Sequence, residues 1–277
     1  MAKNILSEPF LGELADRESE IHSQRTTAKP SDLVLEVQKE VEADPTNVEL
    51  WIKLGRAYRR QQMHREAIDC YSKGITVNPF YGLLYRHRGH AYLNTARWPE
   101  AIADFTTATR LIPDNWDSWY HLGASCFING EYERARQAYV RCYELNDNLQ
   151  MLVAVTDWYW MTLKRLGRDE EAAKLLECIP DTISKEDEKG GGKEYHKRLM
   201  MYKGKITPEE AWADAGTEDI QIITTGYGIA NYYYVNGEEE KGNEIVLKVL
   251  KEGATRYWSA FGYQASLAEA QRRGLKF

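Results

Sequence analysis

The fold is decided by residues 48–149, which divide into three stretches of 34 residues. These read VELWIKLGRAYRRQQMHREAIDCYSKGITVNPFY (48–81), GLLYRHRGHAYLNTARWPEAIADFTTATRLIPDN (82–115) and WDSWYHLGASCFINGEYERARQAYVRCYELNDNL (116–149). Large, small and aromatic residues recur in register across the three stretches. The large position that opens each pattern is Trp51, Tyr85 or Trp119. A fixed period of about 20–50 residues indicates a repeat architecture.

The pattern within each stretch predicts two antiparallel helices. One small residue in each helix lets the two backbones approach closely, and a larger side chain at Ala101 should cost about 1–3 kcal/mol through overpacking. Pro79 and Pro113 lack a backbone donor and therefore help to end the second helix. Asn129 and Gly130 predict the turn between the helices of the third stretch. The small positions are Gly55, Gly89 and Gly123 in the first helices and Ala67, Ala101 and Ala135 in the second.

This spacing of small and aromatic residues resembles the tetratricopeptide repeat (TPR) family, whose units are helical hairpins of this length. The resemblance implies an all-α fold: a right-handed α-solenoid of about six TPR-like hairpins with N- and C-terminal capping helices. It also implies a concave groove, lined by the first helices, in which partners bind as extended peptides or helices. Since a single hairpin leaves an apolar face exposed, stacking of neighbours must supply the stability.

The repeats divide the chain into successive segments. Residues 1–30 are polar and weakly patterned, either disordered or a loosely docked helix. Residues 31–47 predict an N-terminal capping helix from Asp32 to Ala43, with Leu33, Val34, Val37 and Val41 on its apolar stripe. The three regular units follow at 48–81, 82–115 and 116–149.

The register drifts after residue 149. Residues 150–180 predict a degenerate hairpin, in which either the first helix is about three residues too long or the turn at Gly167 is unusual. Residues 181–192 are a charged, glycine-rich loop, and residues 193–254 predict two further hairpins. Thr207 and Glu210 flank a helix start as a capping box. Residues 255–277 predict a C-terminal capping helix that ends at Gly274.

Composition limits the classes of function. The net charge of −6, with 43% hydrophobic and 28% charged residues, is typical of a soluble protein. We expect a cytoplasmic protein, because no run of about 18 apolar residues predicts a membrane span and no secretory signal is visible. The four cysteines form no CxxC pair and predict reduced thiols, and the acidic charge argues against nucleic acid as a partner.

Side chains of the first helices that do not pack between helices should line the groove. They carry positive charge and histidines although the chain is acidic overall. We therefore expect a groove for an acidic peptide or a free carboxylate, which arginine forks bind well; the alternative is a solvated helix face that happens to be basic. The predicted groove residues are Lys53, Arg56, Arg59, Arg60, Arg86, His87, His90, Tyr120 and His121.

Some TPR proteins clamp the C-terminal carboxylates of chaperones with two Lys, two Asn and one Arg at set positions. This chain differs at each of them, which argues against that specificity. The residues at those positions are Ile52, Arg56, His87, Asp117 and His121.

A second candidate surface is aromatic and lies near the C-terminus, at Tyr227, Tyr234 and Tyr263, although these residues are also expected as packing residues. No catalytic, cofactor or metal motif is recognisable, and a metal site at His87, His90 and His121 lacks a completing ligand. We therefore expect a non-catalytic scaffold or adaptor that binds a protein or peptide. The alternatives are a peptide-sensing regulator whose superhelix changes curvature on binding and, less favoured, an enzyme or enzyme subunit.

Overall fold

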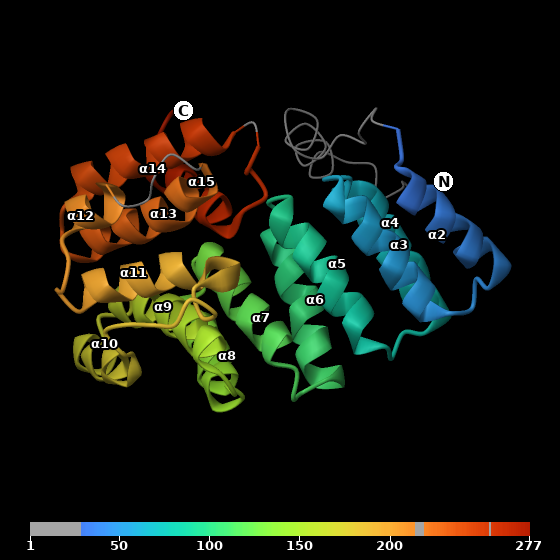
Figure 1. The fold of residues 1–277 in the computed structure, drawn as a ribbon, viewed down its shortest axis with the longest axis horizontal. Coiled ribbons are helices and arrows are strands. Elements are labelled where there is room, and N and C mark those ends of the chain that lie inside the picture. The colour runs from blue at the N-terminus through green and yellow to red at the C-terminus, as the bar shows by residue number, and fades with distance from the viewer. Residues whose placement is uncertain (1–28, 214–218, 255) are drawn as a thin grey trace, which may run out of the picture. The chain divides into compact units, whose positions relative to one another are not determined.

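A computed structural model describes residues 29–213, 219–254 and 256–277, and within these residues the chain is helical with no strand (Figure 1). The all-α, TPR-like solenoid class predicted from the repeats is confirmed. The chain forms two compact units, 1–111 and 112–277. The sequence did not predict this division, which falls just before Pro113. The prediction for residues 1–30 lies outside the described residues, apart from Lys29 and Pro30.

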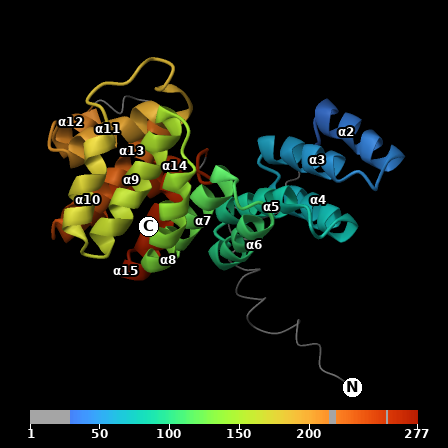
Figure 2. The ribbon, with the colours of Figure 1, turned by 90° about the horizontal axis from the view of Figure 1, so that it is seen from below.

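From residue 29 onward, unit 1 contains a single helix followed by two hairpins, which lie together in Figure 2. Helix α3 packs against α4, and α5 packs against α6, as the repeat predicts. The close approach depends on glycine, since a Cβ atom on Gly55 would lie 2.3 Å from Cε1 of Tyr71. The helices are α2 (Asp32–Ala43), α3 (Val48–Arg60), α4 (His64–Val77), α5 (Gly82–Asn94) and α6 (Trp98–Leu111).

Helix α2 spans the residues predicted for the capping helix, and Val34, Val37 and Val41 are its buried stripe. These valines join the core of α3 and α4, which contains Leu54 and Tyr71. The apolar spacing thus predicted the bounds of α2 and three residues of its buried face, but Leu33, the fourth predicted residue, is 42% exposed.

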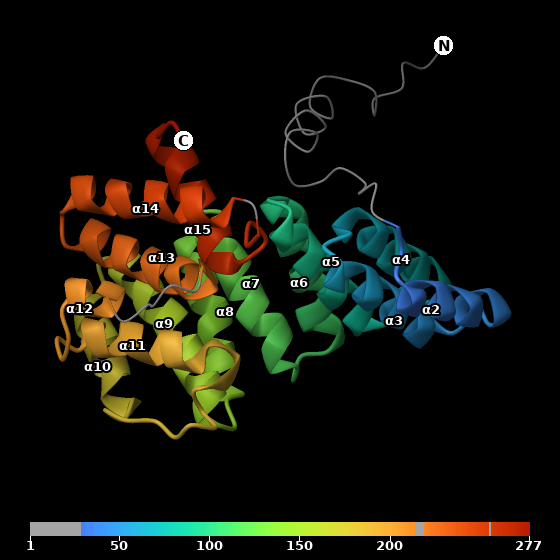
Figure 3. The ribbon, with the colours of Figure 1, turned by 45° about the horizontal axis from the view of Figure 1, so that its top comes forward.

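Unit 2 begins with the third regular hairpin and continues through the less regular helices. Its helices are α7 (Trp116–Ile128), α8 (Tyr132–Glu144), α9 (Leu149–Arg165), α10 (Asp169–Leu175), α11 (Gly192–Tyr202), α12 (Pro208–Ala213), α13 (Asp219–Val235), α14 (Glu239–Gly253) and α15 (Phe261–Arg273). Helices α13 and α14 pack side by side (Figure 3). The turns at Gly130 and Gly167 have positive φ values of 84° and 70°.

Two irregularities explain the lost register after residue 149. Helix α9 is 17 residues long, whereas α3 and α7 have 13, so the first of the two weighed explanations is correct. Helix α15 packs against α13 and α14, and it also contacts α7, the first helix of the unit. Unit 2 is therefore closed on itself, whereas the repeats of an open solenoid contact only their neighbours.

The predicted helix ends of unit 2 are confirmed. The backbone N–H of Thr207 donates to Oε2 of Glu210 at 2.7 Å, and the N–H of Glu210 donates to Oγ1 of Thr207 at 3.1 Å, which is the reciprocal capping box. Gly274 ends α15 with a φ of 65°.

Candidate functional site

The candidate site is a groove of about 290 Å³ on unit 1, between α2 and α3. Leu33 and Val37 of α2 form one wall, and side chains one turn apart on α3 form the other. The groove thus combines an apolar floor with a charged rim. The α3 residues that line it are Glu49, Ile52, Lys53, Arg56, Ala57 and Arg60.

Two of the charged groups on the rim are paired within unit 1. The ammonium of Lys53 lies 2.7 Å from a carboxylate oxygen of Glu40. The hydroxyl of Tyr81 donates to Glu49. Arg56 and Arg60 are exposed, and neither forms an ion pair within the described part of the chain. The positive charge that the groove offers to a partner therefore resides chiefly on these two arginines.

Tyr71 of α4 has a buried hydroxyl that does not line the groove. It has no hydrogen-bond partner among the described residues. Burial raises its pKa to about 12, while the positive charges of Arg59, Arg86 and Arg56 act in the opposite direction.

The remaining predicted residues of unit 1 lie on α3 and α5 and are half-buried: Arg59, Arg86, His87 and His90. On α4, burial and, to a smaller extent, the charge of Arg59 lower the pKa of His64 to about 4. Arg86 contacts Nδ1 of His87 at 3.0 Å, and the His87 ring stacks on Tyr71 with centroids 5.6 Å apart. Nδ1 of His90 lies 2.7 Å from Oδ1 of Asn94.

The two predicted groove residues of unit 2 are buried inside that unit and do not line a groove. Tyr120 and His121 are only 6% and 5% exposed. The Tyr120 hydroxyl contacts that of Tyr195 on α11 at 3.4 Å, and the His121 ring packs edge-on against Phe261 of α15, with centroids 5.3 Å apart. The prediction assumed that the first helix of this unit keeps an open face. Helices α11 and α15 cover that face, so we do not retain these residues in the site.

The second predicted surface is also mostly interior, because Tyr227 and Tyr263 are 0% and 3% exposed. These two tyrosines are packing residues, which was the alternative interpretation of this surface. Tyr234 is half-buried, and its ring lies against two guanidinium groups, 3.7 Å from Arg273 and 5.3 Å from Arg165.

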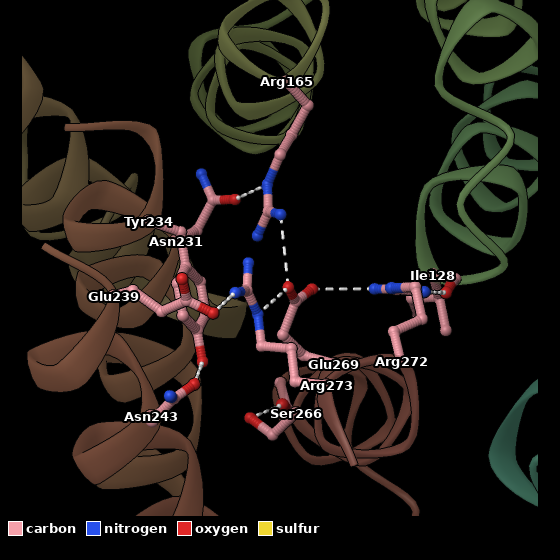
Figure 4. Close-up of polar contacts among 11 residues, drawn as sticks. Ile128, Arg165, Asn231, Tyr234, Glu239, Asn243, Ser266, Glu269, Arg272 and Arg273 are labelled. Carbon is pink, nitrogen blue, oxygen red and sulfur yellow. Dashed lines mark hydrogen bonds and ion pairs between the residues drawn. The ribbon is translucent and has the colours of Figure 1, made fainter. Parts of the chain in front are cut away.

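An ion-pair cluster beside Tyr234 holds α15 in place (Figure 4). The buried carboxylate of Glu269 contacts Arg165 at 3.2 Å, Arg272 at 2.8 Å and Arg273 at 2.8 Å. Nη1 of Arg272 also donates to the carbonyl of Ile128 at 2.6 Å, at the end of α7. Although burial raises the pKa of Glu269, the arginines lower it more. The cluster therefore joins α15 to α7 and α9.

Sequence reasoning missed this cluster. The i,i+3 and i,i+4 spacing of Glu269, Arg272 and Arg273 is a local signal that could have been noticed. Arg165 lies 104 residues from Glu269, and no local pattern connects them. The same holds for Asp157 and Arg198, a fully buried pair 2.8 Å apart.

Other chemical features are limited. No three His, Cys, Asp or Glu side chains in the described ranges lie close enough to hold a metal ion. Cys70, Cys126 and Cys142 are buried free thiols, and Cys178 is an exposed one. Of the helices that the structure describes, none is long and apolar enough to cross a membrane.

Comparison with known proteins agrees with this geometry. Family models described as "Tetratricopeptide repeat" match residues 48–81 and 87–147. Together with the repeated hairpins, these matches show that residues 48–81 and 87–147 are tetratricopeptide repeats. A tetratricopeptide repeat protein from Parabacteroides merdae has 17% identity and a TM-score of 0.54, covering 84% of this chain and 91% of its own, and it supports the fold alone.

Curated relatives match over parts of their length. Human RNA polymerase II-associated protein 3 is 32% identical over 94 residues, which are 34% of this chain and 14% of that protein. Hsp70-Hsp90 organizing protein 3 of Arabidopsis thaliana is 29% identical over 122 residues, 43% of this chain and 22% of that protein. Anaphase-promoting complex subunit 3 of Schizosaccharomyces pombe is 25% identical over 113 residues, 41% and 17% respectively. The matches thus span less than a quarter of these relatives.

Proposed function

We propose that the chain is a non-catalytic, cytoplasmic adaptor that binds an acidic, carboxylate-bearing segment of another protein in the groove of unit 1. The observation that carries the proposal is the pair of exposed arginines, Arg56 and Arg60, beside the apolar side chains of Leu33, Val37 and Ile52. A segment that alternates carboxylates with apolar side chains matches both properties.

The chemistry of arginine supports an anionic partner. A guanidinium presents its donors in a planar fork that fits a carboxylate through two parallel hydrogen bonds. Since the rim is exposed to solvent, we expect the attraction to weaken as salt screens it.

The relatives support a protein as the partner. The name of Hsp70-Hsp90 organizing protein 3 describes a protein that organises Hsp70 and Hsp90, and anaphase-promoting complex subunit 3 is named as part of a complex. We extend to this chain only the binding of proteins, because the positions of the chaperone clamp are occupied differently here.

A titration with defined peptides tests the proposal. The probe is a fluorescein-labelled octapeptide of alternating Glu and Leu with a free C-terminal carboxylate, followed by fluorescence anisotropy. A matched peptide of alternating Lys and Leu should not bind. Reversing two charges with Arg56→Glu and Arg60→Glu should weaken binding of the acidic probe by about a hundredfold, as expected for the loss of two charge-assisted contacts at roughly 1.4 kcal/mol each.

The control variant carries Lys39→Glu and Arg110→Glu, which change the net charge equally at exposed positions outside the groove. This variant should bind the acidic probe nearly as well as the unmodified chain. Equal loss of binding in both variants would show a non-specific charge effect and contradict a groove site. Melting curves of both variants check that folding is retained.

A further inference from the structure

Ser31, which precedes α2, lies at one end of the groove. The backbone N–H of Ser31 donates to Oε1 of Gln61 at 3.2 Å, and Nε2 of Gln61 donates to Oγ of Ser31 at 2.7 Å. Gln61 directly follows Arg60, the last groove residue of α3, and Leu33 of the groove wall lies two residues after Ser31. These hydrogen bonds hold Ser31 beside the end of α3.

The sequence of the preceding segment has the chemistry proposed for a partner. Residues 5–20 read ILSEPFLGELADRESE. They contain five acidic residues and one basic residue, a net charge of −4, together with apolar side chains such as Phe10, Leu11 and Leu14. The groove offers the complementary set of two exposed arginines over an apolar floor.

We propose that residues 5–20 of the chain bind in the groove of its own unit 1 and compete with external acidic partners. This inference rests on the groove proposed above. It assigns to the N-terminal segment the role of an intramolecular ligand, so that a partner must displace it.

The reach of the chain permits this contact. Eight residues separate Glu20 from Lys29, and the nine Cα–Cα steps between these two residues span at most about 30 Å when extended. Helix α3 has 13 residues, which corresponds to a length of about 20 Å. A tether of this kind gives an effective concentration on the order of millimolar. Even a weak attraction between segment and groove would then occupy the groove for much of the time.

Paramagnetic relaxation in the full chain tests the contact without any external partner. Ser7→Cys in a Cys178→Ser background provides one accessible thiol for a nitroxide spin label, because the other three cysteines are buried. We expect the label to broaden the backbone amide signals of α3 around Ile52, Arg56 and Arg60. Adding Arg56→Glu and Arg60→Glu should restore these signals.

The variant with Lys39→Glu and Arg110→Glu is again the charge-matched control, and in it the broadening should persist. Broadening that is absent from the groove, or that is unchanged by Arg56→Glu and Arg60→Glu, would overturn the inference.

A second measurement separates this inference from the proposed function. Glu13→Lys with Asp16→Lys should release the segment and tighten binding of the Glu-Leu probe by about tenfold. If the label broadens the groove but the probe binds neither form, the segment is a ligand and the proposed external partner is wrong. If the probe binds both forms equally and the label leaves the groove signals sharp, the groove is confirmed and the internal ligand is overturned.

Discussion

Helices α3 and α7 occupy the same place in their 34-residue repeats and have the same length of 13 residues, yet they differ in burial. Five residues of α3 are buried, whereas ten residues of α7 are buried. The positions that pack against the second helix are shared, since Gly55 meets Tyr71 and Gly123 meets Tyr139. The difference arises on the other face of each helix.

That face is open on α3 and covered on α7. In unit 2 it is covered by side chains from α11 and α15, such as Tyr195 and Phe261. In unit 1 it lines the groove with Arg56 and Arg60. The repeat signature therefore determines how the hairpins pack, but it does not determine whether their remaining face can bind a partner. Distant segments of the chain decide that.

The largest expected effect tests what keeps unit 2 closed. Glu269→Gln removes the negative charge that three arginines surround. Arg273 still pairs with Glu239, but Arg165, whose side chain is 12% exposed, is left with the neutral Asn231, so unit 2 should lose about 3 kcal/mol of stability. Hydrogen exchange of α15 and urea unfolding measure this loss. Glu133→Gln, which breaks an exposed pair with Arg136, should leave both unchanged. Normal protection of α15 in Glu269→Gln would show that the cluster does not hold the helix.

The next effect is confined to unit 1 and depends on pH. The pKa of His64 falls from its usual 6.5 to about 4 on folding, mainly through burial. Because this pKa is depressed, the associated stability is complete above pH 6.5 and is lost as the pH falls toward 4. The loss amounts to about 3 kcal/mol at 1.36 kcal/mol per pKa unit.

Hydrogen exchange of α3 and α4 between pH 7 and pH 4 measures this acid sensitivity. His64→Leu removes the titrating group and should flatten the pH dependence of unit 1. An unchanged pH dependence in that variant would assign the effect to other groups.

Glycine substitutions test whether the contact between paired helices is the same in the two units. A Cβ atom would lie 2.3 Å from the Tyr71 ring at Gly55 and 2.5 Å from the Tyr139 ring at Gly123. Gly55→Ala and Gly123→Ala should each cost about 1–3 kcal/mol through overpacking. Urea unfolding of both variants checks that the hairpin contact is equivalent in the two units. A cost in one unit only would contradict a shared packing rule.

The smallest effect concerns the turn between paired helices. Ala96 has a φ of 58° at the repeat position where Gly130 has 84°. Since this left-handed conformation strains a residue with a Cβ atom, Ala96→Gly should stabilise unit 1 by about 0.5–1 kcal/mol. Thermal unfolding measures the gain. Ala103→Gly at an exposed position within α6 should instead destabilise by about 1 kcal/mol.

Local patterns predicted much of the fold. The valine spacing placed α2 at Asp32–Ala43, and the capping box placed the start of α12 after Thr207. The sequence offered two explanations for the lost register at α9 and did not decide between them. Helix α9 packs against α11 and α13, and the 34-residue period does not encode these contacts. Contacts between helices far apart in sequence, such as α15 with α7, have no local signature.

The candidate site was predicted in part for the same reason. Repeat position predicted which residues of α3 leave the packed face, and Arg56 and Arg60 line the groove. It did not predict that Glu40 on the preceding helix pairs with Lys53. Repeat position also predicted that Tyr120 and His121 line the groove, but α11 and α15 cover these two residues.

The binding surface is tested most directly by an NMR titration of the full chain with the Glu-Leu octapeptide. We expect shifts of amide signals in α2 and α3 that diminish as salt is added, with α7 and α15 unaffected. Shifts centred on α7 or α15, or no shifts at a peptide concentration of about 1 mM, a concentration that would detect even weak binding, would contradict the claim that the open face of unit 1 is the binding surface.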